Sequence, residues 1–237
     1  MSSLPVQLAF WLLVATSCLS SAVIQRRAVI SSDAVVGFAQ TVPDGLLGTL
    51  YLKYKPYLYV VNGCVPFPAV DAEGNTNGGL APTGASDGDC SSSTGQVYSR
   101  AAAYNDAYAV MYAWYWPKDE PSDGIGHRHD WEGIVVWLSS NSTSATLLGV
   151  AASAHGDFST ETDPAISGSG PLIRYQSEWP LDHSLGFTST VGGQQPLIAW
   201  ESLTDAARTA LENTDFGSAN VPFKDANFAN NLEKAIL

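Results

Sequence analysis

The segment AYAVMYAWYW, residues Ala107 to Trp116, limits most strongly how this chain can fold. Large aromatic and aliphatic side chains alternate in it with mostly small ones, and neither face is polar. The segment is much shorter than the roughly 20 residues that a membrane-spanning helix needs. It therefore predicts a central β-strand that is buried on both faces.

Several other segments have the patterns of strands. Thr49 to Val61 alternates apolar and polar residues, and Pro56 within it indicates an edge strand or a bend. Shorter apolar runs bounded by turn residues predict further strands at Gly133 to Leu138, Ala145 to Ala151, Pro171 to Gln176 and Pro196 to Trp200.

Helical spacing occurs only towards the end of the chain. Glu201 to Asn213 has an apolar stripe, and Ser202 with Asp205 resembles a capping box. Asp225 to Leu237 places Phe228, Leu232 and Ile236 four residues apart. Strands followed by helices predict a mainly β fold, an antiparallel β-sandwich with peripheral helices.

The first residues are typical of a secretory signal. Leu8 to Leu19 is apolar and is followed by small residues, so we expect a signal peptide over residues 1–22. The pair Arg26 and Arg27 marks a short pro-segment, residues 23–27, that ends in a dibasic site. We therefore expect a secreted protein with a single domain over residues 28–237.

The cysteines agree with secretion. Cys18 lies in the predicted signal peptide, so Cys64 and Cys90 remain as a pair in an oxidising compartment, where a disulfide is expected. The sequence NST at Asn141 is a candidate N-glycosylation site.

The charge excludes some partners. Eleven basic and 23 acidic residues give a net charge of −12. Nucleic-acid binding needs clustered Lys and Arg, so we expect no nucleic acid as a partner. Simple attraction to anionic lipid is disfavoured as well. Any membrane contact must therefore be specific or bridged by a cation.

The segment GIGHRHDWEG, residues 124 to 133, gathers the most reactive side chains. In an extended strand, Asp130 and Glu132 share one face and His129 and Trp131 the other. His127 follows two glycines and need not keep that alternation. Asp119 or Asp123 supplies a further oxygen, and such a donor set favours Mg²⁺, Ca²⁺ or Mn²⁺.

Spacing alone leaves other interpretations open. The two acids could simply pair with Arg128 at the surface. Paired carboxylates could also act on a glycoside, and the order His-x-His-x-x-Glu is similar to the cupin metal motif, with His155 or His183 as a further ligand. The chain has no G-x-S-x-G motif, P-loop or dinucleotide fingerprint.

The stretch from Ala109 to Glu132 resembles the central signature of the necrosis- and ethylene-inducing peptide-like proteins, in the type with two cysteines. Its heptad GHRHDWE is intact from Gly126 to Glu132. NGCVPFPAVDAEG, EWPLDHSLGF, QPLIAWESLTDAAR and DFGSANVPFKDANF are similar to other parts of that family. The resemblance covers the chain from about Ala34 to Ala235.

This resemblance implies a β-sandwich with an actinoporin-like architecture and a bound Mg²⁺ or Ca²⁺. The implied ligands are Asp119, His127, Asp130 and Glu132, while Arg128 and His129 would fix the shape of the cavity. The implied membrane partner is the headgroup of glycosylinositol phosphorylceramide, a plant sphingolipid. Trp179, Asp182 and His183 would contact it; without the resemblance, Trp179 would be interpreted as a packing lid.

The function that follows from the resemblance is that of a non-enzymatic, secreted cytolytic toxin. It would act in the host apoplast as a peripheral membrane protein, without a transmembrane helix, and would also trigger immunity through a plant receptor that recognises residues 109–132. One alternative is a non-cytolytic family member that acts only as an immune-triggering pattern. A more remote alternative is a secreted cupin-like metalloenzyme or glycan hydrolase.

Overall fold

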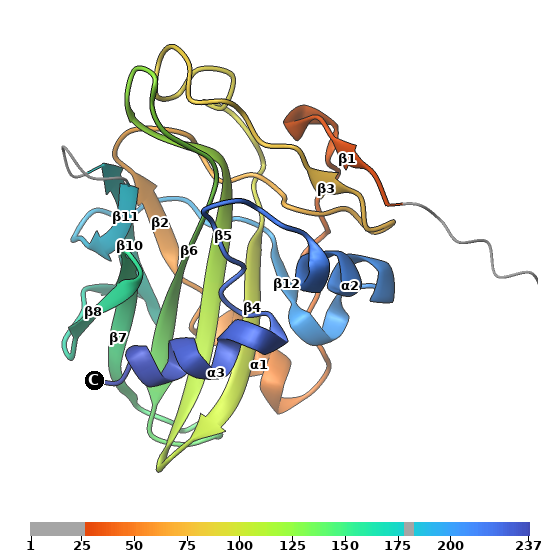
Figure 1. Ribbon diagram of the computed structural model, residues 1–237. Helices are drawn as coiled ribbons and strands as arrows, with labels where there is room; N and C mark the ends of the chain where they lie inside the picture. Colours follow the sequence, from red (N-terminus) through yellow and green to blue (C-terminus); the bar gives the residue numbers. More distant parts are fainter. Residues whose placement is uncertain (1–26, 178–182) are drawn as a thin grey trace, which may run out of the picture.

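The computed structural model describes residues 27–177 and 183–237, and strands dominate it (Figure 1). In this described part the larger sheet has six strands in the order β12-β4-β5-β6-β7-β8. They are β12 (Leu197–Ala199), β4 (Val97–Tyr104), β5 (Ala107–Ser122), β6 (Ile125–Leu138), β7 (Leu147–Ala154) and β8 (Asp157–Glu161). Except for the parallel pair β4–β12, neighbouring strands in it are antiparallel.

A smaller sheet packs against the larger one. Its order is β11-β10-β2, with β9 beside β10. These strands are β2 (Tyr57–Val60), β9 (Ile166–Ser167), β10 (Gly170–Ser177) and β11 (His183–Phe187). Because β11 contacts β5, β6 and β7, the two sheets form a sandwich. Separately, β1 (Val29–Ile30) pairs in parallel with β3 (Thr76–Asn77).

Strand β5 is the centre of the larger sheet. It pairs with β4 on one side and with β6 on the other, and its residues from Tyr108 to Glu120 are all buried. The predicted central strand is therefore confirmed. Between the sheets, the Trp116 ring stacks on Tyr175 with 3.9 Å between centroids. Burial of one such large side chain stabilises the fold by about 1.5–3 kcal/mol.

Helices flank the sandwich as predicted. They are α1 (Leu46–Lys53), α2 (Asp205–Asn213) and α3 (Asp225–Lys234), with short 3₁₀ turns η1 (Ser32–Ala34) and η2 (Trp200–Ser202). The predicted capping box is wrong, because Ser202 lies in η2 and Leu203 is extended. Thr204 caps α2 instead, and its hydroxyl accepts a hydrogen bond from the Ala207 N–H at 3.1 Å.

The strand predicted over Thr49 to Val61 is only partly correct. Its first residues belong to α1, since Leu47, Leu50, Tyr51 and Tyr54 recur at helical spacing and pack into the core. Pro56 separates that helix from β2, which lies at the edge of the smaller sheet. The apolar residues of this segment therefore fit both the alternation of a strand and the spacing of a helix, and the chain forms the helix up to Lys53.

Three other predictions concern the chain's covalent features. The disulfide between Cys64 and Cys90 is confirmed. Asn141 is exposed in the loop after β6, so this position is open to glycosylation. The signal peptide and residues 23–26 of the pro-segment lie outside the described residues.

In the part of the chain that is described, no helix is long and apolar enough to cross a membrane.

Candidate functional site

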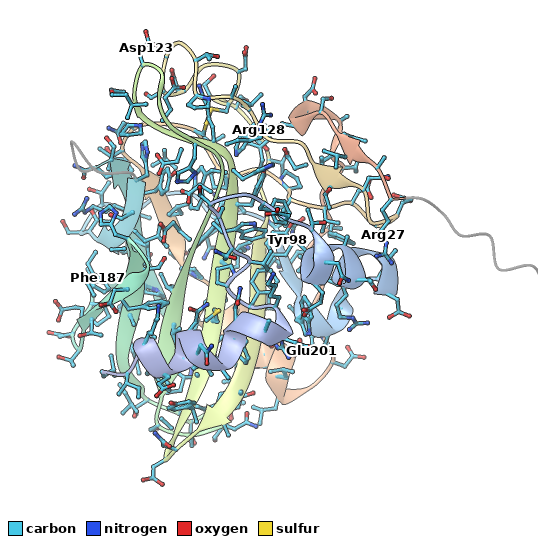
Figure 2. The ribbon with its side chains drawn as sticks, viewed as in Figure 1. Arg27, Tyr98, Asp123, Arg128, Phe187 and Glu201 are labelled. Carbon is cyan, nitrogen blue, oxygen red and sulfur yellow. A yellow bond between two sulfur atoms is a disulfide. The ribbon has the colours of Figure 1, made fainter. Side chains whose placement is uncertain are left out.

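The hairpin of β5 and β6 carries most of the predicted site. Figure 2 shows Asp123 at its tip and Arg128 lower down, beside the loop that carries β3. Gly126 has a φ of +128°, and a Cβ there would lie 2.1 Å from the Asp119 carbonyl oxygen. Only glycine fits this close approach. The glycine thus lets the chain opposite Asp119 bring His127 to the cavity.

The alternation of side chains along β6 breaks at His129. This residue has a φ of +61° in the left-handed region, which non-glycine residues seldom adopt. Arg128 and His129 both lie towards the loop at Gly79, whereas His127 lines the same cavity as Asp130 and Glu132. An unbroken strand would place His127 with His129, so the break is what brings His127 to the acids.

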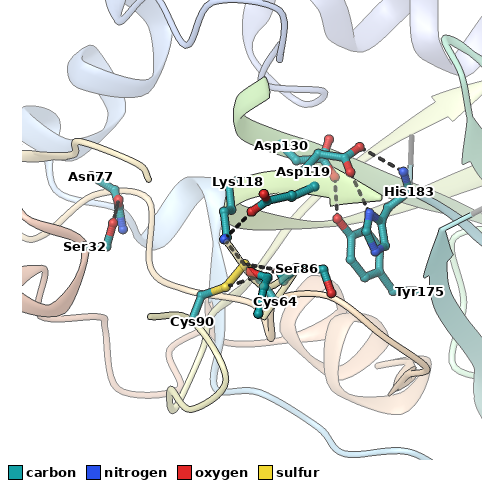
Figure 3. The surroundings of a disulfide bond; sticks show 12 residues. Ser32, Cys64, Asn77, Ser86, Cys90, Lys118, Asp119, Asp130, Tyr175 and His183 are labelled. Atoms are coloured by element: carbon teal, nitrogen blue, oxygen red, sulfur yellow. Dashed lines mark hydrogen bonds and ion pairs between the residues drawn. A yellow bond between two sulfur atoms is a disulfide. The ribbon is translucent and has the colours of Figure 1, made fainter. Parts of the chain in front are cut away.

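Asp119 occupies the centre of the acidic part of the site. Its Oδ2 accepts a hydrogen bond from the His183 backbone N–H at 2.8 Å, and its Oδ1 lies 2.5 Å from His183 Nδ1 (Figure 3). His127 Nε2 lies 4.0 Å from Asp119 Oδ2. Both side chains of the Asp119–His183 pair are buried.

The other two predicted ligands each have a partner from a different strand. The Tyr175 hydroxyl on β10 donates to Asp130 Oδ2 at 2.8 Å, and the Ser153 hydroxyl on β7 donates to Glu132. Burial, and then the neighbouring carboxylate of Asp119, raise the pKa of Asp130 to about 7. Negative charge at this place is therefore poorly compensated by the protein alone.

Arg128 and His129 lie on the side of the hairpin that faces the loop at Gly79. Arg128 donates two hydrogen bonds, to the carbonyl oxygens of Gly78 and Gly79. The alternative in which it pairs with the acids at the surface is therefore wrong for Asp130, which is buried and bonded to Tyr175.

His129 also orients His127. The Tyr115 hydroxyl lies 2.6 Å from His129 Nδ1, and burial, with the charge of Arg128, lowers the pKa of His129 to about 4. His127 Nδ1 lies 2.7 Å from the His129 carbonyl oxygen. Since a carbonyl only accepts, that nitrogen carries the proton, and in a neutral His127 ring Nε2 has the lone pair.

These side chains open into one cavity of about 970 Å³. The predicted ligands Asp119, His127, Asp130 and Glu132 all line it, as do His155 and His183. Of the residues predicted to contact a sugar headgroup, only His183 is described, and its side chain is buried against Asp119. Trp179 and Asp182 lie outside the described residues.

The donor set fits a hard divalent cation in its chemistry. It combines carboxylates with an imidazole. The raised pKa of Asp130 means that its negative charge is unfavourable at this buried position, so a cation bound beside it would stabilise the charged carboxylate. In the described part of the chain, however, no three His, Cys, Asp or Glu side chains are yet arranged to hold an ion.

The sequence did not indicate several residues that shape the site. The packing of the two sheets brings Tyr175 on β10 to Asp130, and the pairing of β7 with β6 brings Ser153 to Glu132. Lys118 and Glu120, on either side of Asp119, form an ion pair that is almost fully buried. Two oppositely charged residues in an otherwise apolar strand are visible in the sequence, and they are the signal that could have indicated this buried ion pair.

Comparison with known proteins agrees with this structure. The chain matches the family described as "Necrosis inducing protein (NPP1)" over residues 48–235. It is 52% identical to NLP effector protein 1 of Phytophthora capsici over 216 residues, which cover 89% of this chain and 92% of that protein.

Solved structures match as well. NLPPya in complex with mannosamine superposes with a TM-score of 0.85 at 52% identity, covering 89% of this chain and 100% of that one. The non-toxic HaNLP3 protein gives a TM-score of 0.83 at 42% identity, covering 86% and 98%.

A mainly β sandwich with peripheral helices and a toxin architecture of the actinoporin type defines the class of protein. The chain belongs to the necrosis-inducing NPP1 family, the NLP effectors. The family is one of secreted cytolytic toxins that act without enzymatic chemistry, although it also contains non-toxic members such as HaNLP3, and it binds divalent cations. The predicted family membership, fold class and non-enzymatic character are thereby confirmed.

Proposed function

We propose that this protein binds the sugar headgroup of glycosylinositol phosphorylceramide in its acidic cavity and permeabilises the plant plasma membrane from the apoplast. The observation that carries the proposal is the convergence of Asp119, His127, Asp130 and Glu132 on one cavity. The structures of NLPPya with mannosamine and with glucosamine support a sugar as the ligand.

In this proposal Asp119, His127, Asp130 and Glu132 hold Mg²⁺ or Ca²⁺, which supplies positive charge to an otherwise repulsive acidic cavity. Tyr175 and Ser153 keep two of the carboxylates in place through their hydroxyls. His183 holds Asp119 from the side of β11. Arg128 and His129 keep the hairpin in the shape that turns His127 inwards.

Charge gives a reason for this arrangement. A protein of net charge −12 is repelled by an anionic membrane surface. Affinity must then come from defined contacts with a headgroup. Trp179, Asp182 and His183 are the residues that we propose as headgroup contacts, on the strength of the family resemblance.

Leakage of dye from vesicles made of plant plasma-membrane lipids tests the proposal. Wild-type protein with Mg²⁺ or Ca²⁺ should release the dye, and a chelator or the variant Asp130→Asn should stop the release. Asp33→Asn, the same change at an exposed position outside the cavity lining, should leak like wild type. Undiminished leakage with chelator and with Asp130→Asn would contradict the proposal.

A second candidate is an immune-triggering pattern without lysis. The similarity of this chain to the non-toxic HaNLP3 protein supports this second candidate. The segment proposed to meet a plant receptor, residues 109–132, is buried from Ala109 to Glu120 in the folded protein. Recognition of that buried part would need a fragment or an opened chain, whereas residues 121–129 at the hairpin tip are accessible in the folded protein. Synthetic peptide 109–132 should elicit ethylene from leaves without vesicle leakage, and an inert peptide would exclude this role.

A further inference from the structure

One wall of the cavity is built from asparagines rather than acids. Asn227, Asn230, Asn231 and Lys234 of α3 follow the spacing i, i+3, i+4, i+7, so they share one helix face, and all line the cavity. Asn220, between α2 and α3, and Phe158 on β8 line it as well. We name the part of the cavity lined by these six residues the amide arm.

Two of these amides are held in fixed positions. Asn227 Nδ2 donates to the Val221 carbonyl oxygen at 2.9 Å, and Asn231 Nδ2 donates to the Pro222 carbonyl oxygen at 2.8 Å. Their Oδ1 atoms accept no hydrogen bond from another described residue. Two carbonyl acceptors are thus positioned in advance for a ligand, which lowers the entropy cost of binding.

The rest of the amide arm is open and contains a single charged side chain, that of Lys234. Asn230 is exposed, and its side chain forms no hydrogen bond within the described part of the chain. Lys234 Nζ donates to the Gly156 carbonyl oxygen at 2.8 Å, which ties α3 to the turn between β7 and β8. The Phe158 side chain is half-buried and offers an aromatic surface.

Amides both donate and accept hydrogen bonds without carrying charge, so they suit hydroxyl groups. An aromatic ring adds an apolar surface against which the C–H groups of a sugar can pack. The cavity volume of about 970 Å³ lies at the upper end of the roughly 300–1,000 Å³ of small-molecule sites. It is larger than one monosaccharide needs.

We propose that the amide arm binds further, uncharged sugar residues of the glycan whose terminal sugar docks at the acidic end. The arm would thereby select longer glycans over a single sugar. This inference rests on the proposed function, because the first sugar is taken to bind beside Asp119 and Asp130.

Calorimetric titration with glucosamine and with a set of disaccharides that carry a terminal glucosamine in different linkages tests the inference. At least one disaccharide should bind about tenfold more tightly than glucosamine. Asn230→Ala, which removes an exposed amide, and Ser218→Trp, which fills an exposed place in the cavity lining, should abolish that gain. Both variants should bind glucosamine like wild type, and Asn141→Ala, outside the lining, serves as the control.

The outcomes separate the two proposals. If glucosamine binds but no disaccharide gains affinity, or if the gain survives in both variants, the amide arm is not a sugar site. If disaccharides bind in an Asn230-dependent manner while glucosamine does not bind, the proposed acidic-end function fails and the amide arm stands. If neither binds, both proposals are overturned.

Discussion

His183 holds Asp119 through two contacts at once: its backbone N–H donates to Oδ2 at 2.8 Å, and its Nδ1 lies 2.5 Å from Oδ1. His183 begins β11 in the smaller sheet, and Asp119 lies on β5 in the larger one. The pair therefore fastens the two layers of the sandwich together at the acidic end of the cavity, and it fixes the orientation of one proposed metal ligand.

Replacement of His183 tests how much its side-chain contact with Asp119 stabilises the fold. His183→Leu removes the side-chain partner of a buried carboxylate, which typically costs about 3–5 kcal/mol of unfolding free energy. His183→Asn keeps a donor at a similar place and should cost about half as much. Urea unfolding of the metal-free proteins measures both values. Equal losses for the two variants would show that the hydrogen bond to Asp119 does not matter.

Stability of the metal-free protein should depend on pH through Asp130, whose pKa is raised to about 7. The unfolded carboxyl titrates near about pH 3.9, so the folded state holds this proton more tightly. Its stabilising contribution is fully present below about pH 4 and is lost as the pH rises through about 7. The neutral side chain of Asp130→Asn has no such dependence.

Melting temperatures of both proteins in chelator, taken between pH 4 and pH 7.5, check the prediction. Wild type should lose stability relative to Asp130→Asn as the pH rises. A constant difference over this range would contradict the assigned pKa.

The disulfide should stabilise the fold substantially. Cys64 and Cys90 are 26 residues apart, and closing a loop of this size is worth about 3 kcal/mol in the chain-entropy model. The double variant Cys64→Ser/Cys90→Ser should unfold at correspondingly lower denaturant, and wild type with reductant should match it. An unchanged midpoint in both would mean that contacts such as the bond from Lys118 to the Ala85 carbonyl hold this loop without the disulfide.

Gly126 and Gly124 offer a matched comparison at the hairpin tip. Both have positive φ, but a Cβ at Gly126 meets the Asp119 carbonyl oxygen at 2.1 Å, whereas a Cβ at Gly124 meets nothing within 4 Å. Gly124→Ala should cost about 1 kcal/mol from backbone conformation alone. Gly126→Ala should cost at least about twice as much and displace Asp119. Thermal unfolding gives the comparison, and similar losses would argue against steric crowding at Gly126.

Much of the fold could be predicted because burial leaves a clear pattern. Ala107 to Trp116 has two apolar faces, and only a central strand of a covered sheet accommodates both. The helices near the C-terminus were visible as apolar stripes. The segment from Thr49 was ambiguous, because Leu50, Tyr51 and Tyr54 satisfy helical spacing while their neighbours also alternate. Local propensity could not decide between the two periods.

The site was harder to predict, because its geometry depends on contacts between distant segments. The proposed ligands lie close together in sequence, and the family motif indicated them. Tyr175, Ser153 and the asparagines of α3 come to the cavity only through sheet pairing and helix packing. The left-handed backbone at His129 also leaves no signal in residue type, yet it decides that His127 lines the cavity.

Calorimetric titration of chelator-treated protein with Mg²⁺ or Ca²⁺ at pH 7 tests the central claim most directly. One ion should bind per chain, and Asp119→Asn, Asp130→Asn and Glu132→Gln should each weaken that binding by tenfold or more, while Asp33→Asn leaves it unchanged. No binding by wild type, or equal affinity in the three cavity variants, would contradict a divalent-cation site formed by these residues.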